Sequence, residues 1–188
     1  MIPVDLLISA YSQGVFPMAD PQGGLSWYSP DPRGVLFLET FHQPHGLKRS
    51  LKKGAFEIRF DTAFEAVMDG CADRAETWID GRIKASYMEL HRLGFAHSVE
   101  TWVDGVLGGG LYGVSLGGVF FGESMFHTVT DASKVALVAL VERMRSSGMG
   151  LLDIQWVTPH LKKFGASEIP RSTYLRLLKQ HIHRPCAF

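Results

Sequence analysis

The chain has 188 residues, of which 46% are hydrophobic and 20% charged, as is usual for a soluble globular protein. Lys and Arg together number 19, and so do Asp and Glu, so no overall charge draws the molecule toward nucleic acid or an anionic membrane. The N-terminus does not have the pattern of a signal peptide, and no apolar run approaches the roughly 20 residues of a membrane span. Cys71 and Cys186 form no CxxC pair and suggest no disulfide framework. We therefore expect a single cytoplasmic domain over residues 1–188 with no membrane partner.

Short helices and strands are expected in the first half of the chain. Apolar residues recur at helical spacing over residues 4–13 and Gly14 follows them, which predicts a helix. The segment 16–34 is crowded with Pro, Gly and Asp, and it predicts a long loop of the kind that is often functional. The elements expected after it are a strand at 35–40, a basic helical segment at 45–54, a strand at 56–61, and helices at 62–73 and 82–95.

Three strands in a meander are the clearest feature of the second half. Residues 97–103, 106–117 and 118–126 read as strands, and the Asp104-Gly105 pair predicts a hairpin turn between the first two. The elements expected after the meander are a helix at 131–148 with Thr130 as its N-cap, a strand at 151–157 and a helix at 171–182. This order predicts an α+β layered domain with a mainly antiparallel central sheet flanked by helices.

One carboxylate interrupts the apolar strand at 118–126. Side chains alternate along a strand, so Glu123 is expected on one face together with Phe121 and Met125. An unpaired carboxylate among apolar residues is costly, so it gains a proton, finds a partner or faces water. Two interpretations are open: Glu123 points to solvent or pairs with an arginine, or it lines an apolar pocket and holds a ligand amine.

A carboxylate and an amide stand two residues apart in the strand at 151–157. Asp153 and Gln155 are expected to project from the same face, with Leu152 and Ile154 on the other. Such a pair is suited to orienting an attacking amine and stabilising the positive charge that develops on it. The alternative is an edge strand whose polar face is simply wet.

Four basic residues of the segment at 45–54 fall on one side of a helix. They are Lys48, Arg49, Lys52 and Lys53. A stripe of this kind contacts phosphates well, although most charge runs are solvated surfaces.

Several well-known site motifs are missing from the sequence. There is no GxxxxGK nucleotide loop, no GxGxxG after a strand, no HExxH and no GxSxG. The histidine pairs lack neighbours at metal-ligand spacing. We therefore expect no cofactor, no metal and no covalent nucleophile.

Six sequence segments, taken together in chain order, are more informative about the family than any single motif. They are AYSQGVFPM, WYSPDPRGVL, GLKRSLKK, FGESMFH, DASKVAL and LDIQWVTPHLKKFGASEIPR. Over residues 4–174 the chain resembles the leucyl/phenylalanyl-tRNA–protein transferase family. The resemblance implies an acetyltransferase-like (GNAT-type) core and an enzyme that moves Leu or Phe from its tRNA to a protein N-terminus beginning with Arg or Lys. That transfer marks the acceptor for N-degron degradation, and the activated ester removes any need for ATP.

The resemblance also implies roles for particular residues. Glu123 corresponds to the contact for the free α-amino group of the aminoacyl moiety, and Asp153 and Gln155 correspond to a catalytic relay at the attacking amine. The positions implied at the side-chain pocket and beside it are Leu111, Gly122, Ser124, Met125, Leu137, Leu152 and Ile154. The positions implied near the terminal adenosine are Tyr11 and Trp78, and those for the tRNA acceptor stem are Lys48, Arg49, Lys52 and Lys53.

Two departures from the family pattern concern the nucleotide end. Members often carry an N-terminal lobe before the AYSQG helix, and we expect this chain to lack it. The residue after VFP is commonly Trp, whereas here it is Met18. We expect a monomer.

Two other functions stay open at this point. The first is an acyl-CoA-dependent N-acyltransferase on the same core, although the sequence offers no glycine-rich pyrophosphate cradle at a helix start. The second is a module that binds an N-terminal peptide or tRNA without catalysis.

Overall fold

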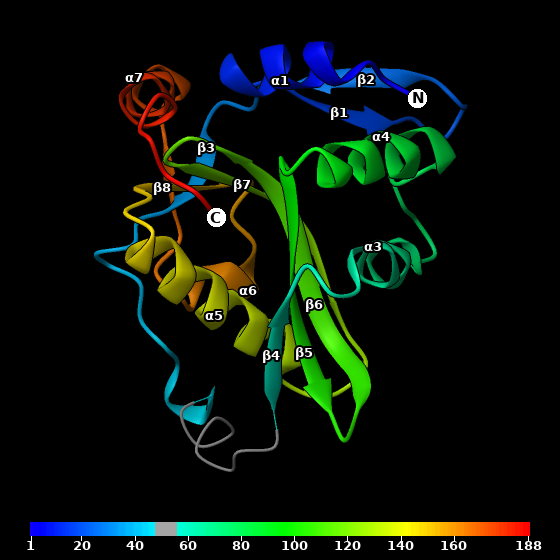
Figure 1. The fold of residues 1–188 in the computed structure, drawn as a ribbon. Coiled ribbons are helices and arrows are strands. Elements are labelled where there is room, and N and C mark those ends of the chain that lie inside the picture. Colours follow the sequence, from blue (N-terminus) through cyan, green and yellow to red (C-terminus); the bar gives the residue numbers. More distant parts are fainter. Residues whose placement is uncertain (48–55) are drawn as a thin grey trace.

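The computed structural model describes residues 1–47 and 56–188. Its centre is a seven-stranded sheet in the order β4-β5-β6-β7-β8-β3-β9, and β5, β6 and β7 form the meander that the sequence predicts (Figure 1). Their bounds are Ala96–Val103, Val106–Leu116 and Val119–His127. The other strands of this sheet are β4 (Glu57–Phe60), β8 (Leu151–Gln155), β3 (Arg33–Leu36) and β9 (Ser167–Ile169). The pairs are antiparallel except β7–β8, so the mixed α+β prediction with a mainly antiparallel sheet is confirmed.

Helices cover both faces of this sheet. One core contains side chains from α1 (Val4–Ser12), α3 (Phe64–Ala72), α4 (Gly81–Arg92) and α7 (Arg171–His181). A second core contains side chains from α5 (Ala132–Ser146), and the short α6 (Pro159–Lys162) packs against it. In Figure 1, α3 and α4 accordingly lie on one side of the long strands and α5 lies on the other. Two separate cores, one on each face, are what a sheet between two helical layers produces.

Local signals explain several element boundaries. Asp104 and Gly105 both have positive φ, 50° and 77°, as the tight turn between β5 and β6 requires. The Asp80 side chain accepts a 2.9 Å hydrogen bond from the Ile83 amide and so caps α4. The predicted cap Thr130 is wrong by one position, because Asp131 occupies the N-cap of α5 in a left-handed conformation.

The predicted long loop at 16–34 is instead mostly strand. Residues Phe16–Ala19 (β1) and Leu25–Tyr28 (β2) pair as a hairpin, and β3 begins at Arg33. The density of Pro and Gly reflects the tight turns between these short strands, so composition alone suggested a loop. The elements α6 and β9 were also not predicted, because each has four residues or fewer.

Part of the predicted basic helix lies outside the described residues. All four members of the basic stripe, Lys48, Arg49, Lys52 and Lys53, fall there. Their contact with a tRNA acceptor stem therefore stays a prediction.

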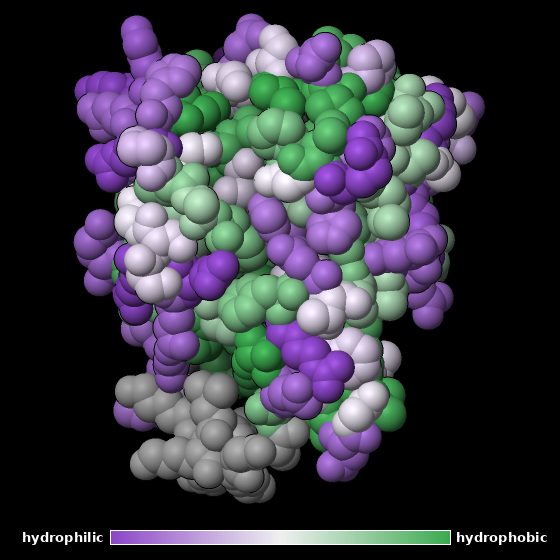
Figure 2. Space-filling model, in the orientation of Figure 1, coloured by the Kyte–Doolittle hydropathy of each residue, from purple (hydrophilic) through white to green (hydrophobic). Residues whose placement is uncertain are grey.

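The surface is a mixture of hydrophilic and hydrophobic residues. On the face shown in Figure 2, hydrophobic residues gather at the top, where Figure 1 places α1 and α4, and hydrophilic residues predominate along the left edge. Across the described ranges, none of the helices combines the length with the apolar character that a membrane span requires.

Two irregularities of the sheet create the space for a site. Leu111 pairs with Met125 and Gly113 with Gly122, so β7 carries one extra residue opposite β6, and Glu123 lies in this bulge. The parallel pairing of β7 with β8 ends at Phe121 and Asp153. Beyond that point the two strands are no longer bonded to each other, and their side chains are free to face a cavity.

Candidate active site

A cavity of about 480 Å³ lies beside the unpaired ends of β7 and β8. Its walls come from both cores of the molecule, so it runs from one face of the sheet to the other. The lining residues are Phe16, Met18, Arg74, Trp78, Leu111, Tyr112, Gly122, Glu123, Ser124, Met125, Leu137, Leu140, Leu152, Ile154, Gln155, Trp156, Thr158, His160 and Leu161.

One half of the cavity is a hydrocarbon wall. Leu111, Met125, Leu137, Leu152 and Ile154 line it, and all five belong to the core on the α5 side or pack against it. Leu111, Met125 and Leu137 are the positions that the family resemblance implied as pocket walls, and Leu152 and Ile154 are substrate-binding positions that it implied beside them. Met side chains are unbranched and flexible, and Leu side chains are not branched at Cβ, so this half suits an apolar group of variable form.

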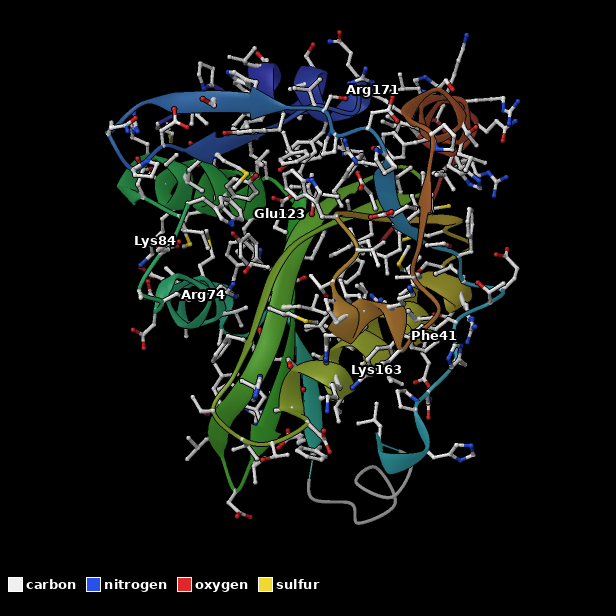
Figure 3. The ribbon with its side chains drawn as sticks, turned by 180° about the vertical axis from the view of Figure 1, so that it is seen from behind. Phe41, Arg74, Lys84, Glu123, Lys163 and Arg171 are labelled. Carbon is white, nitrogen blue, oxygen red and sulfur yellow. The ribbon has the colours of Figure 1, made fainter. Side chains whose placement is uncertain are left out.

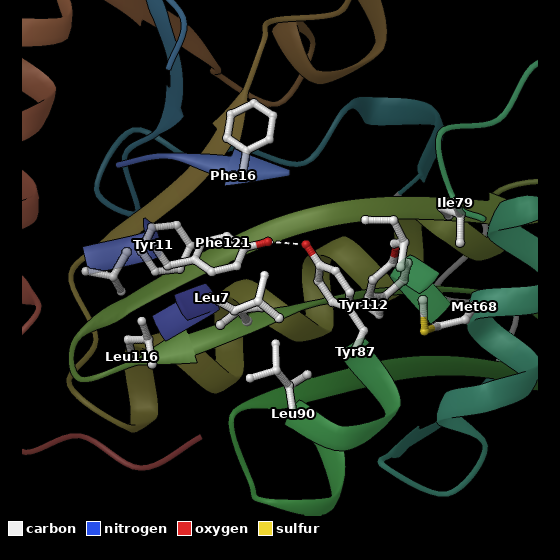
Figure 4. Packing of buried hydrophobic residues seen from close by; sticks show 14 of the residues in the cluster. Leu7, Tyr11, Phe16, Met68, Ile79, Tyr87, Leu90, Tyr112, Leu116 and Phe121 are labelled. Carbon is white, nitrogen blue, oxygen red and sulfur yellow. Dashed lines mark hydrogen bonds between the residues drawn. The ribbon is translucent and has the colours of Figure 1, made fainter. Parts of the chain in front are cut away.

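Glu123 stands at the polar end of the same cavity, and Figure 3 shows it near the centre of the molecule. The Tyr11 hydroxyl donates a 2.8 Å hydrogen bond to Oε1, the Tyr87 hydroxyl donates a 3.3 Å bond to Oε2, and Gln155 Nε2 lies 3.4 Å from Oε1. The two tyrosine hydroxyls also lie within hydrogen-bond distance of each other (Figure 4). Because each hydroxyl has one hydrogen, Tyr87 donates either to Oε2 or to the Tyr11 oxygen while Tyr11 donates to Oε1. No described arginine, lysine or histidine forms an ion pair with Glu123.

The Glu123 carboxyl is held partly in its neutral form. Burial disfavours the charged form and raises its pKa to about 8, although the hydrogen bonds from Tyr11 and Tyr87 act in the opposite direction. The nearby Asp153 charge raises this pKa further, and Arg33 lowers it. Such a group gains most from a cationic ligand, because an ammonium beside it would restore the carboxylate.

The bulge changes which residues share a face of the sheet with Glu123. We expected it to share a face with Phe121 and Met125, and this is wrong for Met125. The extra residue reverses the alternation, so Phe121 belongs to the core on the α1 side while Met125 packs against the other. As a result the carboxylate and the Met125 side chain line different halves of one cavity.

Gln155 reaches the cavity, but Asp153 does not. Gln155 adopts a left-handed backbone conformation at the end of β8, with φ of 56°. Asp153 Oδ1 accepts a 2.9 Å hydrogen bond from the Gln155 amide nitrogen, which supports this conformation. Both side chains are buried, 0% and 6% exposed, and β8 is an inner strand. The alternative of a wet edge strand is therefore wrong.

A buried ion pair holds Asp153. Arg33 Nε donates to Oδ1 at 2.9 Å and Arg33 Nη2 donates to Oδ2 at 2.6 Å, while the Tyr174 hydroxyl donates to Oδ2 at 2.7 Å. Arg33 also donates through Nη1 to the Gly14 carbonyl at 2.8 Å. The carboxylate is thus saturated by protein donors, and Asp153 is not among the residues that line the cavity. The catalytic role expected for Asp153 stays a prediction.

The rim on the α3 side has aromatic and polar residues. Trp78 lines the cavity, and so does Met18, which stands where the family commonly has Trp. Gly122 and Ser124 line it too, whereas Tyr11 contributes through its bond to Glu123 without lining it.

Sequence reasoning missed several members of the site. Arg33, Tyr87 and Tyr174 hold Asp153 or Glu123 by side-chain bonds across 120, 36 and 21 positions of sequence, respectively. No local spacing reveals such contacts. Arg33 had no signal in the sequence either, because its segment was predicted to be a loop.

The comparisons with known proteins identify the family. The model of the leucyl/phenylalanyl-tRNA protein transferase matches residues 35–179. The chain belongs to this family. Proteins called leucyl/phenylalanyl-tRNA–protein transferase from Akkermansia muciniphila and Herpetosiphon aurantiacus are 57% and 53% identical to it. The first alignment covers 94% of both chains, and the second covers 97% of this chain and 96% of the other.

Membership of the leucyl/phenylalanyl-tRNA protein transferase family makes the chain an enzyme that uses an aminoacyl-tRNA donor and a protein acceptor. The model of the family's N-terminal domain matches residues 1–31, the part that folds as α1 and the β1–β2 hairpin. We expected the usual N-terminal lobe to be absent, and the division of the chain into domains stays a prediction.

A more distant likeness concerns the solved structure of L-PGS from Bacillus licheniformis. It has a TM-score of 0.46 at 9% identity, and the alignment covers 80% of this chain and 49% of that one. A likeness of this size does not establish a shared fold, so the acetyltransferase-like architecture stays a prediction.

Proposed function

We propose that this enzyme transfers Leu or Phe from its tRNA to the N-terminal amine of proteins that begin with Arg or Lys, and thereby marks them for N-degron degradation. The observation that carries the proposal is one cavity with a hydrocarbon wall at one end and the unpaired Glu123 carboxyl at the other. An aminoacyl ester has both matching features, an apolar side chain and a free ammonium.

The hydrocarbon half is the proposed seat of the Leu or Phe side chain. Leu111, Met125 and Leu137 form walls that adapt to either shape. The family name states both amino acids, which supports the same assignment. Exclusion of Ile and Val rests on crowding near Cβ, and apolar pockets discriminate by about 1–3 kcal/mol per methylene.

Glu123 is the proposed partner of the donor ammonium. Because its pKa is raised to about 8 by burial, the free enzyme holds a proton there near neutral pH. Arrival of an ammonium favours the carboxylate, so the proton is released as the donor binds. The hydroxyls of Tyr11 and Tyr87 keep the carboxylate oriented toward the ligand.

The proposed reaction is direct attack without a covalent enzyme intermediate. The neutral acceptor nitrogen adds to the ester carbonyl carbon, the bond from that carbon to the ribose oxygen breaks, and an amide and a free ribose hydroxyl result. The proton lost by the nitrogen is the one gained by the ribose oxygen. Gln155 lines the cavity and orients the attacking amine, while Asp153 and Arg33 fix the backbone of Gln155.

The preference for an acceptor with Arg or Lys at its N-terminus rests on the family resemblance. A cytoplasmic location and a monomeric state are part of the same proposal. The free energy that drives the transfer comes from the activated ester itself, so ATP is not a reactant.

A transfer assay tests the proposal. The protein is mixed with radiolabelled Leu-tRNA or Phe-tRNA and a peptide that begins with Arg or Lys, without ATP, and label is measured in the peptide. Label is expected with these donors, little with Ile-tRNA or Val-tRNA, and little with a peptide that begins with Ala. Label from acetyl-CoA in place of tRNA would identify an acyl-CoA enzyme, and binding without transfer would identify a non-catalytic module; either result would overturn the proposal.

A further inference from the structure

Among the described residues that line the cavity, Arg74 is the one arginine, and there is no lysine. It follows α3 and is exposed, and Figure 3 shows it on the same side of the molecule as Glu123. Lining the same space as a carboxyl would ordinarily suggest an ion pair. Arg74 and Glu123 form none.

The guanidinium is held in place by β7. Nη2 donates to the Ser124 hydroxyl at 3.0 Å and to the Met125 carbonyl at 2.6 Å. These two bonds use both hydrogens of Nη2. Within residues 1–47 and 56–188, the remaining donors of Arg74, Nε and Nη1, have no hydrogen-bond partner in the protein, and the residue has no carboxylate partner.

Four other described arginines, Arg33, Arg59, Arg82 and Arg92, each pair with a carboxylate. Arg145 and Arg171 donate to backbone carbonyls as Arg74 does, but neither of them lines the cavity. Arg74 is anchored through neutral groups, so its positive charge and the N–H groups of Nε and Nη1 remain for a ligand. Each of these two nitrogens can donate a charge-assisted hydrogen bond to an oxygen of a phosphate or a carboxylate.

The cavity therefore has a carboxyl and a guanidinium that form no ion pair with each other. Glu123 and Met125 are two positions apart on β7, so their backbone positions are separated by about 7 Å along the strand. A ligand that fits both must carry an ammonium and an anion within one short unit. The aminoacylated 3′-terminal nucleotide of the proposed donor has both, in its α-ammonium and its 5′-phosphate.

We propose that Arg74 binds the 5′-phosphate of the terminal nucleotide of the donor. Two bonds to β7 preorganise the guanidinium, so little side-chain entropy is lost on binding. A charge-assisted hydrogen bond from Nε or Nη1 supplies affinity at this end, while Glu123 supplies it at the other. This assignment rests on the proposed function and adds a second electrostatic contact to it.

Minimal donors with and without the phosphate test the assignment. The probes are 3′-O-phenylalanyl-adenosine and its 5′-monophosphate, used with the wild type, Arg74→Gln and Arg74→Lys. For the wild type we expect the phosphate to lower KM by roughly 10- to 100-fold, the range of a hydrogen bond to a charged group. Arg74→Gln should lose this advantage, so that the KM values of the two donors become similar, and Arg74→Lys should keep part of it.

The matched control is Arg92→Gln, which removes an exposed arginine of α4 that does not line the cavity. It should behave as the wild type with both donors. With full-length aminoacyl-tRNA, Arg74→Gln should also reduce the slope of log affinity against log salt by about 0.7, the value for one phosphate contact to a single strand. An Arg74→Gln variant that loses affinity equally for both donors, or that keeps the phosphate advantage, would overturn the assignment. Absence of transfer by the wild type would instead overturn the proposed function.

Discussion

Arg33 and Asp153 form a two-bond ion pair, at 2.9 and 2.6 Å, in which the side chains are 1% and 0% exposed. The pair joins the start of β3 to the end of β8, and the ring of Tyr174 stacks against the guanidinium at 4.3 Å. Burying two charges is costly, so such a pair adds little to stability by itself, but removing one partner is severe. Asp153 also accepts a hydrogen bond from the Gln155 amide nitrogen, so the pair is linked to a residue that lines the cavity.

Asp153→Ala is expected to destabilise the fold by about 3–5 kcal/mol, because the Arg33 charge is left buried without its partner. It should also lower kcat by about 100-fold through misplacement of Gln155, with little change in the KM of the donor. Denaturant unfolding and steady-state kinetics measure the two effects.

The double variant Arg33→Met/Asp153→Leu separates stability from positioning. It removes both charges, so most of the stability should return while kcat stays low. Recovery of turnover together with stability would show that the ion pair has no part in positioning Gln155.

Glu123→Gln should alter the pH dependence of stability. Burial raises the pKa of Glu123 from 4.5 to about 8, so between these values the folded chain binds more protons than the unfolded chain. The free energy of unfolding therefore falls as pH rises through this window and levels off above it. The variant does not lose stability in this way, so the Tm of Glu123→Gln minus the Tm of the wild type should increase from pH 4.5 to pH 8.

Thermal unfolding over this pH range measures the difference. Glu142→Gln, an exposed glutamate of α5, is the control for loss of one negative charge. A difference in Tm between wild type and Glu123→Gln that does not vary with pH would contradict the raised pKa.

Gly113→Ala should disturb the bulge that carries Glu123. A Cβ at Gly113 would lie 2.2 Å from the carbonyl oxygen of Phe121, which is backbone and has little freedom to move. We expect β6 and β7 to shift apart, a loss of about 1–3 kcal/mol of stability and a higher KM for the donor.

Gly81→Ala makes the same chemical change where nothing lies within 4 Å, at the first residue of α4. It should leave KM unchanged and should not destabilise the protein, since Ala is favoured over Gly by up to about 1 kcal/mol in helices. Equal effects of the two variants on KM would remove the bulge from the account of donor binding.

Leu137→Phe should narrow the hydrocarbon half of the cavity. The larger side chain of a Phe donor should suffer more than that of a Leu donor, shifting the ratio of kcat/KM toward Leu by about 10- to 200-fold. Competition between Leu-tRNA and Phe-tRNA measures this ratio directly.

Leu178→Phe is a control in the core on the opposite face of the sheet, away from the cavity. It should lower stability by overpacking without changing the ratio of the two donors. A Leu137→Phe variant that slows both donors equally would place the substrate side chain elsewhere.

Strong local patterns predicted most of the fold. The hairpin at Asp104-Gly105, the helix that became α4 and the strand that became β5 each depend on residues that are close in sequence. The β1–β2 hairpin was not predicted, because four-residue strands between turns have too few positions to show a period.

The sequence by itself determined the α+β class, the meander, the family, and a set of pocket residues that do line one cavity. These properties follow from short-range periodicity and from motifs that need no coordinates. Tertiary structure alone decided the bulge at Glu123, the burial of Asp153 against Arg33, and the anchoring of Arg74 that leaves its Nε and Nη1 donors available. Each of these depends on which strands pair, and in which register, and on contacts between side chains that are far apart in sequence. Local patterns do not encode that information.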